Sequence, residues 1–225
     1  MIDIHTHILP NIDDGAKSVN ESIEMLVDSY KQGVTHCVLT PHCVIHSENA
    51  IEDFLMRRER SYQILRERIC TYENIPKIFC GAEVYCDHDI SKYEDIFKLC
   101  IGKTNYMLIE FPITKRKKIF TDWVYSLRMK DIKVIIAHIE RYPNYNDIIT
   151  DLEGLDIIYQ INASNIINLG KRKIVKQIIK QNESFIVASD MHNMTSRRCK
   201  MQKAKSIAKK KHWEKELFRE EELNG

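Results

Sequence analysis

Short apolar runs separated by longer amphipathic segments define the pattern of this chain. The segments between the runs have helical spacing, as in the stripe formed by Ile23, Leu26 and Tyr30. Runs rich in Val, Ile and Tyr recur at residues 2–4, 34–39, 77–84, 106–111, 132–137, 157–161 and 185–188. The pattern therefore predicts seven strands, most of them followed by a helix.

The first predicted helix has well-marked ends. Ser18 and Glu21 have the spacing of a capping box, in which side chains satisfy backbone donors that the helix leaves free. Gly33 stands where a left-handed residue is expected to end the helix. These signals predict a helix between the first two strands.

Alternation of strands and helices predicts an α/β fold with parallel strands that are buried on both faces. The chain has only seven glycines and five prolines and no linker-like stretch, so we expect one domain over residues 1–225. Seven βα units form either an open doubly wound sheet or a closed, distorted barrel, and periodicity does not choose between them. Both architectures place active sites at the carboxyl ends of the strands.

Composition excludes several classes of protein. With 225 residues, 44% hydrophobic and 29% charged, the chain is able to bury a sizeable core and is not disordered. Its 34 Lys and Arg against 32 Asp and Glu are too balanced to indicate nucleic acid or an anionic membrane as the main partner. The basic run at residues 115–118 is interpreted as a solvated loop, and the alternative is a surface that guides a phosphoprotein to the site. Without a long apolar stretch or a signal sequence, we expect a cytoplasmic protein with no membrane insertion.

The seven cysteines do not indicate disulfides or thiol catalysis. They are odd in number, lack CxxC spacing and mostly fall in apolar runs, which is typical of reduced core thiols. None is followed six residues later by arginine, so the anion-binding arm of a cysteine phosphatase is missing. The Gly102-Lys103 pair lacks the glycine that a P-loop needs five residues earlier, because Phe97 stands there.

A histidine or carboxylate follows six of the seven apolar runs. His5 and His7 end the first run, two residues apart, so both imidazoles point to the same side of an extended chain. This pair alone also suits ordinary polar histidines. Carboxylates at the ends of buried strands, in contrast, are costly unless they are paired or bind metal. The residues at the other strand ends are His42, Glu83, Glu110, His138, Asp190 and His192.

These strand-end residues, with Asp14 from the loop after the first run, are candidate metal ligands. The set exceeds what one ion needs and therefore indicates two or three divalent ions, with one carboxylate as a bridge. It contains no thiolate, which favours Mn²⁺, Fe²⁺ or Zn²⁺ over softer ions. The candidates are His5, His7, Asp14, His42, Glu83, Glu110, His138, Asp190 and His192.

The charge of such a centre indicates an anionic substrate. Three divalent ions and four carboxylates leave a net charge of about +2, which suits a phosphate dianion. Arg141 and Arg197 lie just after His138 and His192 and are candidates for bidentate bonds to phosphoryl oxygens. The alternatives are a surface ion pair of Arg141 with Glu140, and an ordinary helix-start position for Arg197.

A series of motifs gives the chain a family resemblance. In order, they read IDIHTHILPNIDDG, LTPH, CGAE, YMLIEFP, IIAHIERY, QINAS and FIVASDMHN, followed by Arg197. The chain resembles the PHP (polymerase and histidinol phosphatase) family. Within it, the chain is most similar to the metal-dependent protein-tyrosine phosphatases encoded with capsule and exopolysaccharide genes of Gram-positive bacteria. The resemblance implies the PHP fold, a distorted (β/α)₇ TIM-like barrel, and three clustered ions, with Mn²⁺ favoured and Fe²⁺ or Zn²⁺ as alternatives.

The resemblance also implies how the candidate ligands are shared among the ions. Glu83 is the expected bridge, and Arg141 and Arg197 are the expected substrate-binding and catalytic residues. The three sets are His5, His7, Glu83 and Asp190; Glu83, Glu110 and His138; and Asp14, His42 and His192.

The function implied is hydrolysis of phosphotyrosine by a metal-activated water, with no phosphoenzyme. The expected partner is a phosphotyrosine protein, specifically a bacterial tyrosine autokinase that controls capsular or extracellular polysaccharide synthesis. Tyrosine's phenol has a pKa near ~10, so its phenolate leaves without a dedicated general acid. The alternatives are a small-molecule phosphatase such as histidinol phosphatase, and a metal-stabilised regulatory scaffold that binds its partner without catalysis.

Overall fold

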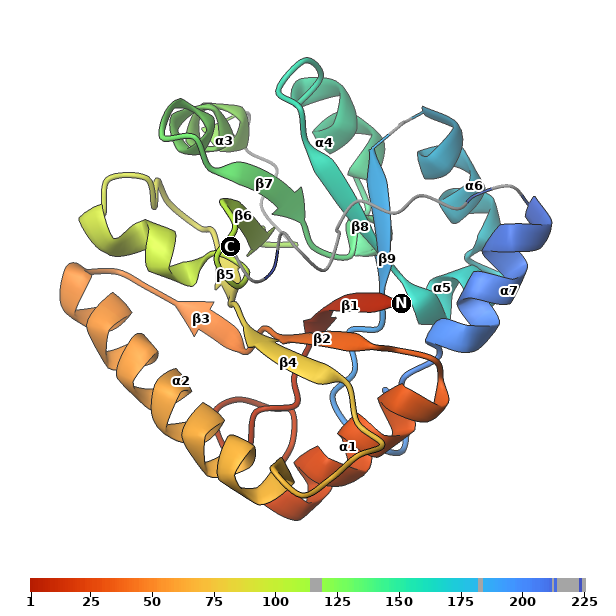
Figure 1. The fold of residues 1–225 in the computed structure, drawn as a ribbon. Helices are drawn as coiled ribbons and strands as arrows, with labels where there is room; N and C mark the ends of the chain where they lie inside the picture. The colour runs from red at the N-terminus through yellow and green to blue at the C-terminus, as the bar shows by residue number, and fades with distance from the viewer. Residues whose placement is uncertain (114–118, 182–183, 212, 214–222, 224–225) are drawn as a thin grey trace.

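The structure, a computed structural model, describes residues 1–113, 119–181, 184–211, 213 and 223. Their strands form two parallel sheets with helices around the outside (Figure 1). The smaller sheet contains β1 (Ile2–Thr6), β2 (His36–Leu39) and β4 (Lys77–Cys80). The larger sheet contains β3 (His42–Val44), β5 (Glu83–Tyr85), β6 (Tyr106–Glu110), β7 (Lys133–Ile136), β8 (Ile158–Asn162) and β9 (Phe185–Ala188), in that order.

Two strands of the smaller sheet continue into the larger sheet after a short interruption. β2 leads into β3 across Thr40 and Pro41, and β4 leads into β5 across Gly81 and Ala82. The pairing register is the same on both sides of the break, because Leu39 pairs with Cys80 and His42 pairs with Glu83. Pro41 lacks an N–H and cannot donate to the ladder. The single strand predicted at residues 77–84 is wrong in detail, because it is divided into β4 and β5, and the prediction missed β3.

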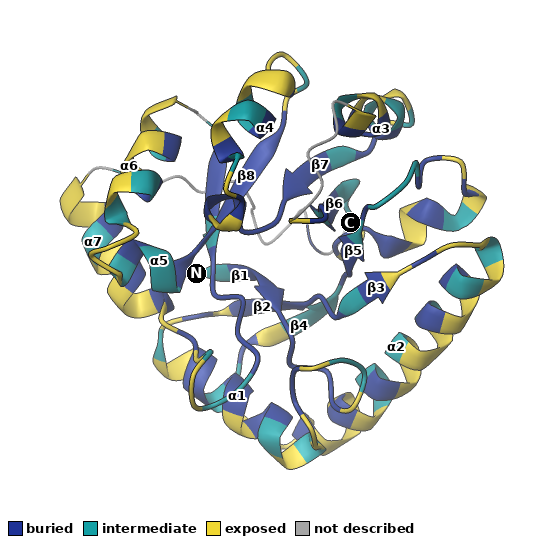
Figure 2. Ribbon diagram, turned by 180° about the vertical axis from the view of Figure 1, so that it is seen from behind, coloured by how far each residue is buried: buried dark blue, intermediate teal, exposed yellow. Residues whose placement is uncertain are grey.

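Seven α-helices and two 3₁₀ segments accompany these strands in the described residues, and their buried faces point toward the sheets (Figure 2). Both predicted ends of α1 are confirmed. The side chain of Ser18 accepts a hydrogen bond from the Glu21 N–H at the start, and Gly33 has a φ of 81° just after the end. The elements are α1 (Val19–Lys31), α2 (Glu48–Ile69), η1 (Glu94–Leu99), α3 (Ile119–Met129), η2 (Ile139–Arg141), α4 (Tyr145–Asp151), α5 (Ala163–Ile167), α6 (Arg172–Gln181) and α7 (Met201–Lys211).

Apolar side chains form two separate clusters. The larger one lies between the strands and the helices. The smaller one, here called the inner cluster, collects side chains from strands of both sheets. Its members are Ile4, Val38, Ile101, Leu108, Ile135, Ala137, Ile158, Ile186, Ala188 and Leu223. The two sheets share this interior, because members of the inner cluster come from β1, β2, β6, β7, β8 and β9.

The first and last strands lie side by side although they belong to different sheets. Thr6 forms a parallel bridge with Met191, and the His7 N–H donates to the Met191 carbonyl at 2.8 Å. The Asp190 N–H donates to the His5 carbonyl at 3.0 Å. These bonds bring the two ends of the predicted ligand series together.

Two expectations concern regions beyond the core. Among the described residues, no helix is both long enough and apolar enough to cross a membrane. The basic run at residues 115–118 lies outside the described residues.

Candidate metal centre

All nine predicted ligands lie close together at the carboxyl ends of the strands. Three overlapping groups bring one ligand atom of each member to within 4.8 Å of the others. The groups are His5, His7 and Asp190; His42, Glu83 and Glu110; and His7, Asp14, His42 and His192. His138 joins them, because its Nε2 lies 2.9 Å from Glu83 Oε1 and 3.4 Å from Glu110 Oε1.

The orientation of His5 follows from a buried glutamine. Its Nδ1 donates to Gln160 Oε1 at 3.0 Å, and the same oxygen accepts the His138 N–H at 2.7 Å. Because that amide oxygen only accepts, the proton of a neutral His5 ring lies on Nδ1. Its Nε2 is then free to bind a cation, and lies 3.2 Å from Glu83 Oε2 and 3.6 Å from Asp190 Oδ1.

His7 is oriented in the same way by a carboxylate. Its Nδ1 donates to Asp13 Oδ2 at 2.7 Å, and that oxygen also accepts the His42 N–H at 3.0 Å. Asp13 therefore leaves the His7 Nε2 facing the cluster, 3.1 Å from the Nε2 of His5. A carboxylate behind a histidine is a common support for metal-binding imidazoles.

Glu83 occupies the middle of the cluster. Its carboxylate is buried, with Oε2 lying 3.2 Å from His5 Nε2, 3.3 Å from His7 Nε2 and 3.0 Å from His42 Nδ1. Its other oxygen, Oε1, contacts His138. A carboxylate shared among four imidazoles has the position expected of a bridging ligand.

Asp14 lies at the solvent side of the cluster. Its Oδ1 lies 3.3 Å from His42 Nε2 and 3.4 Å from His192 Nε2. The Asp14 side chain is 63% exposed, whereas His192 is buried. The cluster is therefore open to solvent at this point.

Lone pairs without matching donors show that the residues fit a metal centre. The Nε2 atoms of His5 and His7 face each other and two carboxylates, and none of these groups has a proton to share in its ordinary ionisation state. Glu83 Oε2 and His192 Nε2 are buried and have no hydrogen-bond partner within the described part of the chain. Buried acceptors in this arrangement require cations.

Electrostatics within the cluster favours positive charge. Burial lowers the pKa of His5, but the charges of Glu83 and Asp190 outweigh it and raise that pKa to about 10. Burial raises the pKa of Glu83, yet the His5 charge and the hydrogen bond from His138 to Oε1 hold it well below its ordinary value. Burial and the neighbouring His7 lower the pKa of His192 to about 3, which keeps this ring neutral and able to act as a ligand.

Backbone conformation directs two of these side chains, those of His138 and Asp190, into the cluster. His138 and Asp190 have φ values of 33° and 52°, in the left-handed region that non-glycine residues rarely adopt. Each directly or closely follows a strand, so the turn redirects its side chain into the cluster. Gly15 allows the loop that carries Asp13 and Asp14 to approach His7, because a Cβ at Gly15 would lie 2.0 Å from the His7 carbonyl oxygen.

Both predicted arginines approach the cluster at Asp190. Arg197 donates from one guanidinium nitrogen to both oxygens of Asp190, at 2.7 and 2.8 Å, and a nitrogen of Arg141 lies 3.6 Å from Asp190 Oδ2. Both guanidinium groups stay partly exposed. The alternative for Arg141 does not hold, because the buried Glu140 accepts hydrogen bonds from Asn162 and Asn165. The alternative for Arg197 is also wrong, since α7 begins only at Met201.

The sequence analysis missed the residues that hold the ligands in place. The sixth predicted strand carries no ligand, but Gln160 and Asn162 on it support the centre. Gln160 donates to Asn162 Oδ1 at 2.7 Å, and the Asn162 amide donates to Asp190 Oδ2 at 2.8 Å. Two polar residues spaced by two in a fully buried strand were the signal that would have identified them.

The cysteines take no part in this centre. Cys43 lies next to His42, but its side chain is buried in the apolar core, and burial raises the pKa of its thiol to about 12. All seven cysteines are free, as predicted. A buried, protonated thiol is not a nucleophile.

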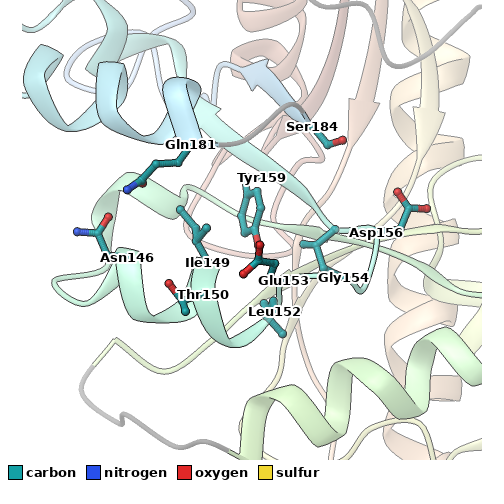
Figure 3. Close-up of a pocket in the computed structure, with 11 residues that line it drawn as sticks. Asn146, Ile149, Thr150, Leu152, Glu153, Gly154, Asp156, Tyr159, Gln181 and Ser184 are labelled. Carbon is teal, nitrogen blue, oxygen red and sulfur yellow. The ribbon is translucent and has the colours of Figure 1, made fainter.

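A pocket elsewhere in the molecule is separate from this chemistry. It has a volume of about 340 Å³ and lies beside the amino-terminal starts of β8 and β9, at the opposite end of these strands (Figure 3). Its lining includes Asn146, Tyr159 and Gln181 but none of the predicted site residues.

Comparison with known proteins supplies the family. A family model described as capsular polysaccharide synthesis, CpsB/CapC, matches residues 1–220. The chain belongs to the CpsB/CapC family. The tyrosine-protein phosphatase CpsB of Streptococcus pneumoniae is 34% identical over 239 residues, covering 97% of this chain and 95% of that protein. The tyrosine-protein phosphatase YwqE of Bacillus subtilis is 28% identical and covers 93% of this chain and 84% of its own length.

A solved structure extends the family relationship to three dimensions. The study that contains it describes YwqE from Bacillus subtilis and CpsB from Streptococcus pneumoniae as unique metal-dependent tyrosine phosphatases. The match has a TM-score of 0.79 at 26% identity and covers 96% of this chain and 89% of that one. CpsB/CapC proteins and this chain therefore share the mixed α/β architecture with parallel sheets.

Proposed function

We propose that this chain is a metal-dependent protein-tyrosine phosphatase that acts in capsular or extracellular polysaccharide synthesis. The observation that carries the proposal is the convergence of nine histidine and carboxylate side chains at the strand ends. It occurs in a chain that aligns over nearly its full length with a protein named as a tyrosine-protein phosphatase.

The fold in this proposal is a single domain over residues 1–225 with a distorted (β/α)₇ barrel of the PHP type. Two observations support closure of the barrel. β1 lies beside β9, and the inner cluster collects side chains from strands of both sheets. Seven strands result when β2 with β3, and β4 with β5, are each taken as one interrupted strand.

The cofactors in this proposal are three divalent ions, with Mn²⁺ favoured. His5, His7, Glu83 and Asp190 would hold the first ion, and Glu83, Glu110 and His138 would hold the second. Asp14, His42 and His192 would hold the third. The grouping is supported by the distances within the cluster and by the central position of Glu83.

When bound, the ions supply Lewis acidity and make water nucleophilic at neutral pH. The chain's own groups perform the remaining tasks. Gln160 and Asp13 hold the histidine tautomers in which Nε2 is a ligand. Arg141 and Arg197, on the rim beside Asp190, bind phosphoryl oxygens and offset the charge that develops on them.

The leaving group accounts for the absence of an assigned general acid. Phenolate, with a conjugate-acid pKa near ~10, departs with little protonation, whereas a serine alkoxide does not. Phosphotyrosine is therefore a suitable substrate for a site that supplies metal ions and arginines. The partner in this proposal is a phosphotyrosine protein, specifically a bacterial tyrosine autokinase.

The test compares substrates and metals in one assay. The full chain is treated with EDTA, dialysed, and assayed for phosphate release from a phosphotyrosine peptide and from histidinol phosphate after re-addition of Mn²⁺, Fe²⁺ or Zn²⁺ singly. We expect no release without metal and preferential turnover of the peptide with Mn²⁺.

Two results would contradict the proposal. Faster turnover of histidinol phosphate would identify a small-molecule phosphatase. A folded, metal-loaded protein that is inactive on every phosphoester would identify a regulatory scaffold.

A further inference from the structure

A second group of metal-ligand residues lies outside the predicted centre. His46, Asp87 and His88 each place one ligand atom within 4.8 Å of the others. Two of these residues are half-buried and His46 is exposed. None of them belongs to the three groups at the strand ends, and the sequence analysis did not single them out.

The pairing of β3 with β5 explains why the three residues meet. His42 pairs with Glu83, and Val44 pairs with Tyr85. His46 and Asp87 each follow two residues later, at equivalent positions of the two adjacent chains. Four residues of extended chain span about 13 Å, so the group lies within about that distance of His42 and Glu83. It shares no residue with the groups at the strand ends.

A buried tyrosine orients the central histidine of the group. His88 Nε2 lies 3.2 Å from the Tyr93 hydroxyl, and the two rings meet edge to face with centroids 5.9 Å apart. Tyr93 is only 5% exposed. A hydrogen bond from behind the ring is the usual way in which a metal-binding imidazole is held.

The other nitrogen of His88 faces a carboxylate. Its Nδ1 lies 2.7 Å from Asp87 Oδ1. In the tautomer in which Nε2–H donates to the Tyr93 hydroxyl, a neutral His88 ring presents a lone pair at Nδ1. A cation bound there would replace the proton that Nδ1 otherwise shares with Asp87. His46 approaches from the other chain, with its ring centroid 5.2 Å from that of His88.

Asp87 is ionised in this setting. Burial alone raises the pKa of its carboxyl group, but the hydrogen bond and charge of His88, with the charge of His46, hold that pKa below its ordinary value. The group thus offers two imidazoles and one carboxylate.

From this geometry we propose that His46, Asp87 and His88 bind one divalent transition-metal ion of the Zn²⁺ type, separately from the centre at the strand ends. Two imidazoles and one carboxylate are a set that zinc and its neighbours bind, whereas Mg²⁺ and Ca²⁺ prefer oxygen ligands alone. An anion is excluded as the occupant because Asp87 would repel it.

Only a small movement is needed to complete the site. Ligands about 2.1 Å from a tetrahedral ion lie about 3.4 Å from one another. The three ligand atoms now lie within 4.8 Å of one another, and the His88 Nδ1–Asp87 Oδ1 pair, at 2.7 Å, has to open to that spacing. His46 lies in the short connection between β3 and α2, and its side chain is exposed. Three protein ligands leave a coordination position open to water or to a further ligand.

The experiment compares zinc stoichiometry among variants of the full chain. Wild type, His46→Gln, Asp87→Asn and the control Asp122→Asn are stripped with EDTA, loaded with Zn²⁺, dialysed and measured by elemental analysis. Asp122 is an exposed carboxylate on α3 and belongs to none of the metal-ligand groups in the described residues. We expect His46→Gln and Asp87→Asn each to bind one ion per chain fewer than wild type and Asp122→Asn.

Equal stoichiometry in all four proteins would overturn the proposal. His46 is exposed, so His46→Gln keeps the test valid if Asp87→Asn does not fold. Phosphatase activity with Mn²⁺ is measured in parallel, and we expect His46→Gln to retain it. Loss of the extra zinc with retained activity therefore separates this site from the proposed function.

Discussion

The two ends of the same strands carry opposite kinds of side chain. The inner cluster is wholly apolar and precedes the metal centre along the strands, whereas the metal centre at the carboxyl ends is made of histidines and carboxylates. On β6, Leu108 belongs to the inner cluster and Glu110 to the metal centre. On β9 and its extension, Ala188 belongs to the first and Asp190 to the second.

The contrast shows where stability and function reside. Burying an apolar side chain such as Leu108 contributes roughly 2 kcal/mol by removing its surface from water. Burying Glu83 has the opposite effect, because an ionised carboxylate loses its hydration and regains energy only from partners. The strands therefore hold together at one end and position reactive groups at the other.

The largest effect is expected for Glu83→Gln. An amide in place of the central carboxylate removes the charge that faces four imidazoles, so we expect metal content to fall and phosphatase activity to drop by about three orders of magnitude. Elemental analysis beside steady-state kinetics measures both. Glu73→Gln, an exposed position, is the matched control. Full metal content with near-normal turnover would show that Glu83 is not a bridging ligand.

Arg141→Ala is expected to lower activity by roughly two orders of magnitude, the scale for loss of one oriented charged donor. Its metal content should stay unchanged, because Arg141 only approaches Asp190 at 3.6 Å. Arg141→Lys should restore part of the activity, since an ammonium group does not reproduce a planar fork. Steady-state kinetics of wild type, Arg141→Ala and Arg141→Lys measure these activities. A loss of less than twofold in the alanine variant would show that Arg141 does not bind substrate.

Arg197→Ala should differ from Arg141→Ala in one respect. Arg197 donates to both oxygens of Asp190, so its removal releases a proposed metal ligand as well as a phosphate-binding group. We expect a similar loss of activity and, in addition, weaker metal binding. Identical metal affinity in the two alanine variants would indicate that Arg197 does not position Asp190.

Gln160→Leu tests the support behind the ligands. The change keeps the size of the side chain but removes the acceptor for His5 Nδ1, and we expect about 10- to 100-fold weaker Mn²⁺ binding. Titration of the EDTA-treated protein with Mn²⁺ gives the affinity, and saturating Mn²⁺ should restore most of the activity. Gln202→Leu, on the exposed face of α7, serves as the control. Unchanged affinity would contradict the role assigned to Gln160.

Leu108→Ala should have the smallest effect on catalysis. Loss of a fully buried side chain from the inner cluster is expected to lower the free energy of unfolding by about 2–5 kcal/mol. Turnover per folded molecule should remain near that of wild type. Chemical denaturation gives the first quantity and kinetics below the unfolding transition gives the second. A large loss of turnover with little loss of stability would show that the inner cluster does not serve mainly to stabilise the fold.

Much of the centre was predictable because its ligands follow apolar runs directly. Parallel strands bring their carboxyl ends to one edge, so residues as distant as His5 and Asp190 were expected to meet. The prediction that His5 and His7 face the same side is confirmed by the 3.1 Å between their Nε2 atoms.

The remaining features depend on contacts that a linear pattern does not contain. The break at Pro41 leaves the register unchanged, so hydrophobicity shows neither β3 nor the division of the strand at residues 77–84. Gln160 and Asp13 act through other residues, and their partners are distant in sequence or belong to a loop. The same holds for the His46 group, which forms only because β3 pairs with β5.

The most direct test of the central claim is to locate the ions themselves. Crystals of the wild-type chain grown with Mn²⁺ would be measured at the manganese absorption edge for anomalous scattering. The account predicts three peaks at the strand ends, with the Glu83 carboxylate between two of them and His5, His7, His42, His138 and His192 among the ligands. Ions bound only away from the strand ends, or an empty cluster in a protein that is active with Mn²⁺, would contradict it.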